Sequence, residues 1–302
     1  MSSSSNSHKA ILYAFLANLG IALAKTWAAF FTGSGSMTAE AIHSFADCGN
    51  QMLLYLGIHQ SQRPADAEHP MAYGKLSYFW SFIVAILLFS VGGLFSIYEG
   101  WHKLSSSEPL HQPSVGLVVL AVSVILEALS LRGCIAQITP LRGDRSLWDW
   151  LKTTRNAELV VVLGEDIAAL VGLTFALIGL GLATTTGDTV YDALGSIAIG
   201  AVLVAVSVFV ASHIKTLLVG RSAEPELEMV IKKVINEDPN VTKLWNLITL
   251  QFGPDIMVAA KIGMSEELRV GEVIPNINSL EERIKRTVPE VRWCFMELDN
   301  KD

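Results

Sequence analysis

The chain has 302 residues, of which 51% are apolar and only 17% are charged, and its mean hydropathy is +0.43. Soluble domains carry charge at about a quarter of their positions, so this composition favours an integral membrane protein. The formal net charge of −7 argues against a basic surface for nucleic acid, and an odd number of cysteines argues against a disulfide framework.

Residues 1–9 are polar and lack the order of basic, apolar and small residues that marks a removable signal peptide. We therefore expect the first apolar stretch to remain as a helix. A transmembrane helix needs roughly 20 mostly apolar residues, and six stretches qualify. They form a predicted transmembrane domain over residues 1–221, with spans at about 10–32, 36–59, 78–98, 115–131, 159–183 and 193–211.

Positive charges in short loops indicate which side of the membrane faces the cytoplasm. The loop after the second predicted span contains Arg63 and Lys75, and five arginines and lysines lie between the fourth and fifth spans. The opposite side has only Lys103. The pattern predicts a multi-pass protein of the cell (inner) membrane with both termini in the cytoplasm.

Residues 222–302 are polar and acidic, and they predict a small cytoplasmic domain. Its elements follow the order helix, strand, strand, helix, strand, over residues 226–236, 244–252, 256–262, 273–287 and 291–298. Two helices over three strands make a two-layer, ferredoxin-like α+β domain. The predicted fold class is therefore an all-α six-helix transmembrane bundle followed by this small α+β domain.

One face of the second predicted span is polar. Its members lie three or four residues apart and share one side of a helix; they are Glu40, His43, Asp47 and Asn50. An ionisable side chain within a span costs about 2.5–3.5 kcal/mol on insertion scales and indicates a functional site. The central pair offers an imidazole and a carboxylate one turn apart, which suits Zn²⁺ and other divalent transition ions.

The fifth predicted span contains a second acidic pair, Glu165 and Asp166, whose side chains point about 100° apart around the helix. A single polar residue in a span often only hydrogen-bonds across a helix interface. Two opposed clusters in separate spans favour a metal site instead.

Three other charged residues are weaker signals. We expect Lys25 to neutralise a carboxylate or to reach the membrane surface. Glu127 is expected to form an interfacial ion pair with Arg132, about one turn away. Asp192 is expected to cap the sixth span.

The order of these residues resembles the cation diffusion facilitator family. The second helix of that family and the loop after it are similar to G-S-x-S-M-x-A-E-A-I-H-S-F-A-D (33–47) and A-D-x-E-H-P-x-x-Y-G-K-x-x-Y-F-W (65–80). Its fifth and sixth helices and its hinge are similar to L-x-E-D-I-A-A-L-V-G-L (163–173), Y-D-A-L-G-S-I-A-I-G (191–200) and L-L-V-G-R-S-A-E-P-E (217–226). The likeness covers nearly the whole chain, and these motifs most resemble the branch of the family that includes the animal mitochondrial zinc transporter.

The resemblance implies a transport site of two residues four apart on the second helix and two on the fifth. The first pair falls on His43 and Asp47. The acidic member of the second pair falls on Asp166, but its partner position holds Val162, which cannot bind a metal. Glu165 or water is the expected fourth ligand.

The resemblance also implies a lesser site in the loop after the second helix. Asp66 and His69 match its ligands, whereas its third position holds Tyr73, so a weak or absent site is expected. C-terminal domains of this family often bind metal through histidines, and this chain has none after His213. The candidate replacements on the last predicted strand are Cys294, Glu297 and Asp299.

In function, the resemblance implies a homodimeric antiporter that exports a divalent metal ion, Zn²⁺ before others, from the cytoplasm in exchange for protons by alternating access. No permanent cofactor, enzyme activity or nucleic-acid partner is expected. One imidazole with carboxylates also suits Mn²⁺, Fe²⁺ or Co²⁺, and a metal-binding membrane scaffold that does not transport is the alternative from another class. A metalloenzyme is less favoured because an H-E-x-x-H or comparable motif is missing, as is a channel, because it would need a repeated ring of ligands.

Overall fold

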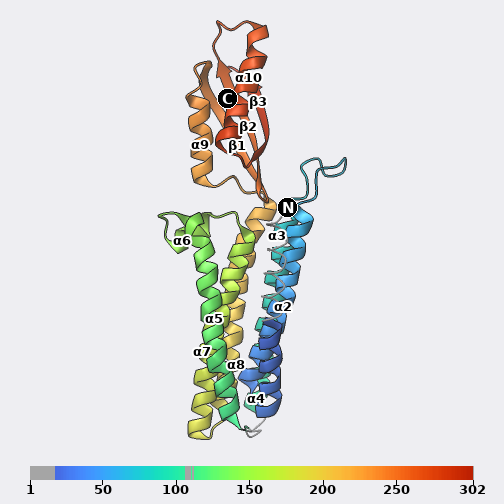
Figure 1. The fold of residues 1–302 in the computed structure, drawn as a ribbon, viewed down its shortest axis with the longest axis vertical. Coiled ribbons are helices and arrows are strands. Elements are labelled where there is room, and N and C mark those ends of the chain that lie inside the picture. The colour runs from blue at the N-terminus through green and yellow to red at the C-terminus, as the bar shows by residue number, and fades with distance from the viewer. Residues whose placement is uncertain (1–17, 106–109, 111, 302) are drawn as a thin grey trace, which may run out of the picture. The chain divides into compact units, whose positions relative to one another are not determined.

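The computed structural model of the chain describes residues 18–105, 110 and 112–301, so residues 10–17 of the first predicted span lie outside the described part. The chain forms two compact units (Figure 1). The first unit contains the described residues up to Gly57, Trp80–Asp144 and Glu158–Ile214. The second contains Ile58–Phe79, Arg145–Ala157 and the described residues of Lys215–Asp302.

The first unit is built from long helices that run alongside one another (Figure 1). Residues 18–32 are helical. The helices that follow are α2 (Gly35–Ser61), α3 (Leu76–Leu87), the π-helix η1 (Leu88–Leu94), α4 (Phe95–Ser105), α5 (Pro113–Arg142), α7 (Ala157–Thr186) and α8 (Val190–Val219).

Within the described residues, four helices are long and apolar enough to cross a membrane. They are the joined helix Leu76–Ser105 and α5, α7 and α8, each of 30 residues. The polar face of α2 lowers its hydropathy, and this 27-residue helix is not among the four. The mostly helical bundle is confirmed, and the count of six spans stays a prediction.

The spanning helices extend beyond the predicted boundaries, most clearly in α5. Its predicted end lies at residue 131, but the helix continues to Arg142. The span predicted from hydropathy ends before the first basic residue, Arg132, because hydropathy measures only side chains. The backbone must still satisfy its hydrogen bonds, and continuing the helix does so whether or not the side chains are apolar.

Glycines bring α8 against η1 and α4. A methyl group at Gly200 would lie 2.6 Å from the carbonyl oxygen of Gly93, and one at Gly100 would lie 2.7 Å from that of Ala193. Any larger side chain would separate the helices. Close approach at small residues is the usual way in which helices pack in lipid, where burial of apolar side chains gives little driving force.

The start of α2 is held by Asp192 in the first turn of α8. Its carboxylate accepts hydrogen bonds from the Ser34 hydroxyl at 2.7 Å and from the Gly35 backbone N–H at 2.6 Å. A carboxylate at this position satisfies a free N–H of α2 and interacts favourably with the helix dipole. The prediction that Asp192 caps its own helix is wrong, because Asp188 accepts the N–H of Val190 there.

The C-terminal part of the second unit is an α+β domain. Its elements are α9 (Pro225–Asn236), β1 (Val241–Phe252), β2 (Asp255–Met264), α10 (Val270–Thr287) and β3 (Val291–Leu298). The strand order is β1-β2-β3, with β1 antiparallel and β3 parallel to β2. The predicted helix–strand–strand–helix–strand order is confirmed. A short helix in the loop before α7, α6 (Leu147–Thr153), has no counterpart in the prediction.

The two helices of this domain pack on one face of its sheet. The buried cluster between them is aliphatic apart from one thiol, and includes Ile231, Ile235, Ile256, Val258, Ala260, Ile262, Leu280, Ile284 and Cys294. Each large aliphatic side chain buried in this way contributes about 1.5–3 kcal/mol. Apolar burial is therefore the main source of stability in this domain.

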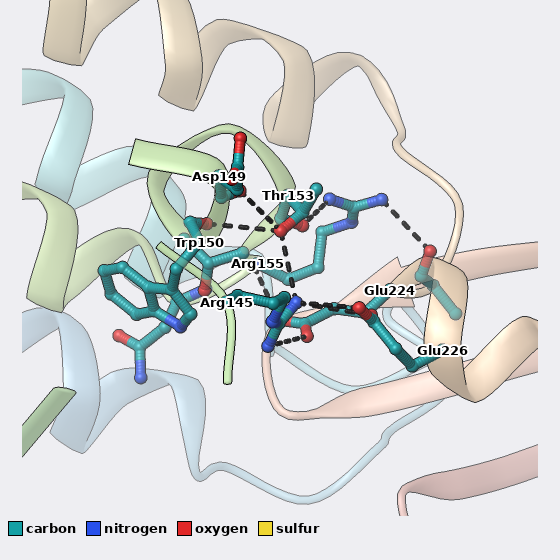
Figure 2. A network of polar contacts seen from close by, with 10 residues as sticks. Arg145, Asp149, Trp150, Thr153, Arg155, Glu224 and Glu226 are labelled. Carbon is teal, nitrogen blue, oxygen red and sulfur yellow. Dashed lines mark hydrogen bonds and ion pairs between the residues drawn. The ribbon is translucent and has the colours of Figure 1, made fainter. Parts of the chain in front are cut away.

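Figure 2 shows a polar network that joins the segment before α7 to the segment between α8 and α9. The Arg155 guanidinium donates to the Ser222 carbonyl oxygen at 2.7 Å, and the Arg155 backbone N–H donates to Glu224 at 3.2 Å. Arg145 forms an ion pair with Glu226 at 3.2 Å. Burial lowers the pKa of Arg155 to about 10, so its guanidinium remains charged at neutral pH and keeps these contacts.

Candidate metal centre

Two residues of α2, His43 and Asp47, form the first half of the candidate centre. One helical turn places the imidazole Nε2 3.5 Å from Asp47 Oδ2. His43 is 1% exposed, and neither of its ring nitrogens, nor Asp47 Oδ1, has a hydrogen-bond partner among the described residues. Buried polar atoms nearly always have partners, so these atoms indicate a place where a ligand binds.

The acidic pair of α7 forms the second half, and its two members have different neighbours. Glu165 accepts a hydrogen bond of 2.6 Å from the Asn50 amide of α2. Asp166 accepts one of 3.2 Å from the Ser130 hydroxyl of α5, while its other oxygen, Oδ2, has no partner within the described part of the chain. Asn50 therefore joins α2 to α7, and Ser130 joins α5 to α7.

A cavity of about 70 Å³ lies between these helices. It is lined by polar and acidic residues from the first helix, α2, α5 and α7, together with a few apolar ones: Asn18, Ile21, Ser44, Asp47, Gln51, Glu127, Ser130, Val162, Glu165, Asp166 and Ala169. A cavity of this size and polarity can hold water or a hydrated ion. Three of the four predicted site residues thus line one cavity, and the fourth, His43, lies beside Asp47.

The arrangement is not a finished coordination sphere. In the described residues, no three side chains of the types His, Cys, Asp and Glu lie close enough together to hold an ion. The first-row ions take nitrogen and oxygen ligands at about 2.0–2.2 Å, so the ligands must converge when a metal binds. The predicted set of His43, Asp47, Glu165 and Asp166 remains a prediction.

Glu127 lies elsewhere than the sequence predicts. It lines the cavity with Asp47 and Asp166, and the structure gives it no ion pair with Arg132 within the described chain. The two residues are five positions apart on α5, so their side chains point in different directions around the helix. The predicted interfacial pair is therefore wrong, and Glu127 belongs to the acidic lining.

Lys25 forms a buried ion pair beside the centre. Its ammonium lies 3.2 Å from Glu40 Oε2 and donates to the Ser44 hydroxyl at 2.8 Å, and both charged side chains are 0% exposed. The first of the two expectations for Lys25, neutralisation of a carboxylate, is confirmed. Since Ser44 lines the cavity, the Lys25 ammonium contacts a residue of the cavity wall.

The π-helix η1 is the part of the centre that sequence periodicity misses. A methyl group at Gly92 within η1 would lie 3.9 Å from His43 Nδ1, so the π-turn packs against the imidazole. Single π-turns inside α-helices are frequent at functional sites. The pair Gly92-Gly93 is the only local signal for it in the sequence.

The loop pair Asp66 and His69 is brought together but already engaged. Asp66 Oδ1 accepts the backbone N–H of His69 at 2.7 Å, and Oδ2 accepts the Tyr73 hydroxyl at 2.6 Å. The Tyr73 hydroxyl lowers the pKa of Asp66, with a smaller contribution from the His69 N–H. Both carboxylate oxygens thus accept hydrogen bonds within the loop itself, and the weak or absent metal site stays a prediction.

The candidate ligands on the last strand do not meet. Cys294 faces the aliphatic cluster beneath the helices, and burial raises the pKa of its thiol to about 12, so it is not a thiolate at neutral pH. Asp299 and Glu297 lie 3.3 Å and 3.8 Å from the ammonium of Lys261. These three residues therefore do not form a metal site in the structure described.

A large part of the chain matches a known protein family. Residues 11–219 match the cation efflux transmembrane domain. The mitochondrial proton-coupled zinc antiporter SLC30A9 of Xenopus laevis is 34% identical over 225 residues, which cover 74% of this chain but only 40% of that protein. The magnetosome protein MamB of Paramagnetospirillum magneticum is 26% identical over 286 residues, covering 93% of this chain and 90% of that protein. A cadmium form of the MamM C-terminal domain has 14% identity and a TM-score of 0.24, and covers 26% of this chain and 98% of that one. Because the transmembrane match covers more than half of its residues, the chain belongs to the cation efflux family, also called the cation diffusion facilitator family.

Proposed function

We propose that the protein exchanges a divalent metal ion, Zn²⁺ in the first place, for protons across a membrane. The observation that carries this proposal is the cavity between α2, α5 and α7, which Asp47, Glu165 and Asp166 line. Buried oxygens of Asp47 and Asp166 have no hydrogen-bond partner there within the described residues. Intramembrane carboxylates of this kind mark ion pathways. The zinc antiporter relative adds support for the ion and for proton coupling.

Alternating access is the mechanism that fits such a site. A site within the bundle that opens to one side at a time moves an ion without forming a pore. Metal and protons compete for the same imidazole and carboxylate atoms, because a ligand must be deprotonated to bind metal. Each metal ion bound on one side therefore releases protons, and the site takes protons back when it opens on the other side.

The test is uptake of ⁶⁵Zn²⁺ into proteoliposomes with an imposed proton gradient. Asp47→Asn and Asp166→Asn remove one charge each at nearly constant volume. Both should reduce gradient-driven uptake by at least about 10–100-fold, the loss that follows from removing even a partner of a metal ligand. Asp144→Asn, an exposed carboxylate outside the cavity lining, is the matched control and should transport like the unchanged chain. Full uptake in both cavity variants would contradict this site.

Two alternatives remain open to the same assay. One imidazole with carboxylates also suits Mn²⁺, Fe²⁺ and Co²⁺, and competition by each ion against ⁶⁵Zn²⁺ ranks them. A metal-binding scaffold would bind Zn²⁺ but carry no flux in either direction. Counterflow in the absence of a proton gradient distinguishes a transporter from a scaffold, because only a transporter exchanges labelled for unlabelled ion.

The proposed orientation places both termini in the cytoplasm of the cell's inner membrane and the direction of metal flow outward. It rests on the basic loops, including Arg63 and Lys75. A green fluorescent protein fused to the C-terminus should fluoresce, whereas alkaline phosphatase fused there should be inactive. The opposite pair of results would reverse the orientation.

A homodimer is part of the proposal, and the open face of the sheet supports it. Neighbouring residues on this face include Ile248, Ala259 and Phe295, one from each strand. Ile248 is 56% exposed and Phe295 57%, and an apolar row of this kind favours contact with a partner. A Phe295→Asp variant should shift the purified protein from dimer to monomer in light scattering, whereas an unchanged mass would remove the sheet face from the interface.

A further inference from the structure

The centre as predicted from the sequence lacks one protein ligand. Three residues, His43, Asp47 and Asp166, hold suitable atoms, and the position one turn before Asp166 is Val162. Val162 lines the cavity but offers only hydrocarbon. Zn²⁺ sites usually have four ligands, so the missing one must come from Glu165, from another helix or from water.

α5 places a carboxylate at the same cavity. Glu127 lines it together with Asp47, Val162 and Asp166. Ser130, about one turn further along α5, donates to Asp166 Oδ1 at 3.2 Å. Residues three apart share a helix face. The hydrogen bond from Ser130 therefore turns toward α7 the same face of α5 on which Glu127 lies.

Glu127 is also less engaged than its rival Glu165. One oxygen of Glu165 is held by the Asn50 amide at 2.6 Å, which makes it part of the link between α2 and α7. Within the described chain, Glu127 has no hydrogen bond or ion pair. A carboxylate that already has a structural partner must give it up to bind an ion, whereas Glu127 has no such partner among the described residues.

An independent observation indicates that something binds between these groups. Asp166 is 8% exposed and lines the cavity, yet its Oδ2 has no partner among the described residues. A buried polar atom that stays unsatisfied destabilises the folded chain. A cation between Asp166 and Glu127 would satisfy the atom and neutralise both carboxylates.

We infer that Glu127 of α5 is a ligand of the transported ion and takes the place left by Val162 on α7. The coordination set is then His43, Asp47, Asp166 and Glu127, with one nitrogen donor and carboxylate oxygens. This inference rests on the proposed function for its cargo and deepens it. A set rich in carboxylate oxygen broadens selectivity from Zn²⁺ toward Mn²⁺, Fe²⁺ and Co²⁺, and the three helices must close on the ion together.

The test uses equilibrium binding of Co²⁺ to the purified full chain in detergent, read by dialysis and by the visible absorption of the bound ion, which reports its coordination. Glu127→Gln should weaken binding by about 10–100-fold, which is at least the loss found for outer-shell partners of metal ligands, and should change the absorption spectrum. Glu99→Gln, a helical glutamate outside the cavity lining, is the matched control and should change neither.

A rescue separates a ligand from a residue that only supports the fold. Val162→His places an imidazole one turn before Asp166, the same spacing as between His43 and Asp47, so it should restore affinity when added to Glu127→Gln. Unchanged affinity in Glu127→Gln overturns the inference, as does weaker binding with an unchanged spectrum or without rescue. Because binding is measured without flux, a failure of zinc antiport leaves this result readable, and a failure of this inference leaves antiport standing.

Discussion

The two units bury different chemistry. Around the cavity of the first unit, charged and polar groups such as Lys25, His43 and Asp166 lie out of contact with solvent, and several of their atoms have no partner within the described residues. In the C-terminal domain the buried cluster is aliphatic with a single thiol. Ion pairs such as Arg292 with Asp255 lie at the surface, and the buried Asp238 is paired with Arg283. Burial of apolar side chains therefore stabilises the C-terminal domain, whereas burial of charged groups around the cavity costs free energy.

The difference indicates where we expect the function to lie. Apolar burial in the C-terminal domain needs no partner molecule to explain it, because it lowers the free energy by itself. Buried charges in a membrane are retained only where they are paired or where they serve an ion. The first unit contains both kinds: Lys25 and Glu40 are paired, whereas His43 and Asp166 have atoms without a hydrogen-bond partner in the described part of the chain.

Removing the paired cation should produce the largest effect on stability. Lys25→Met leaves Glu40 as an uncompensated buried charge, and breaking a buried pair costs about 3–5 kcal/mol. The double variant Lys25→Met with Glu40→Gln should recover most of this loss, because both charges are then gone. The measurement is the free energy of unfolding in mixed detergent and denaturant. A single variant as stable as the unchanged chain would show that the pair is not buried as described.

Enlarging a cavity in the aliphatic cluster should have a smaller effect, confined to the C-terminal domain. Leu280→Ala should destabilise that domain by about 3 kcal/mol, within the usual range for a buried leucine. Hydrogen exchange at β2 measures the loss, and Co²⁺ binding at the cavity should stay unchanged. Ile274→Ala on the same helix is the control, since Ile274 is 63% exposed and surface changes lie within about 0.5 kcal/mol. Weakened Co²⁺ binding in Leu280→Ala would mean that the two regions are not separate in energy.

The sequence predicts the local parts of this comparison well. His43 and Asp47 share a face because they are four residues apart on one helix, which the spacing alone determines. The order of helices and strands in the C-terminal domain follows from alternation and from the turn at Gly253, a glycine with φ of +61°. Each of these features depends on residues that are close in sequence.

The parts that the sequence does not predict depend on contacts between distant elements. Asp192 binds the start of α2 across 158 positions, and no local pattern distinguishes that role from a cap on its own helix. Glu127 reaches the cavity because Ser130 bonds to α7, which sets the rotation of α5. The π-turn beside His43 arises where glycines let η1 approach α8. Packing decides all three, so spacing along one helix cannot.

Loosening the polar network in Figure 2 should have a moderate effect within the second unit. Arg155→Ala removes the hydrogen bonds to Ser222 and its neighbour, and a bond from a charged donor is worth about 1.5–3 kcal/mol. Arg155→Lys keeps the charge but not the planar fork, so it should restore only a small part. Limited proteolysis between α8 and α9 measures the loss. Complete protection in Arg155→Ala would show that this segment is held by other contacts.

The smallest effect should come from an exposed pair in the loop before α3. Tyr73→Phe removes the hydroxyl that donates to Asp66 Oδ2 at 2.6 Å, so the pKa of Asp66 should rise toward its ordinary value, while the His69 N–H keeps it somewhat low. A lowered carboxylate pKa contributes stability above the ordinary pKa and loses it as the pH falls through the lowered value. The variant should therefore begin to lose that contribution at a higher pH than the unchanged chain.

Carbon NMR of labelled aspartate carboxyls follows the titration, with Glu68→Gln as a neighbouring control that keeps the hydroxyl. Because the Asp66 side chain is 50% exposed, water replaces the lost donor, so the loss of stability should be far smaller than that from breaking the buried Lys25 pair.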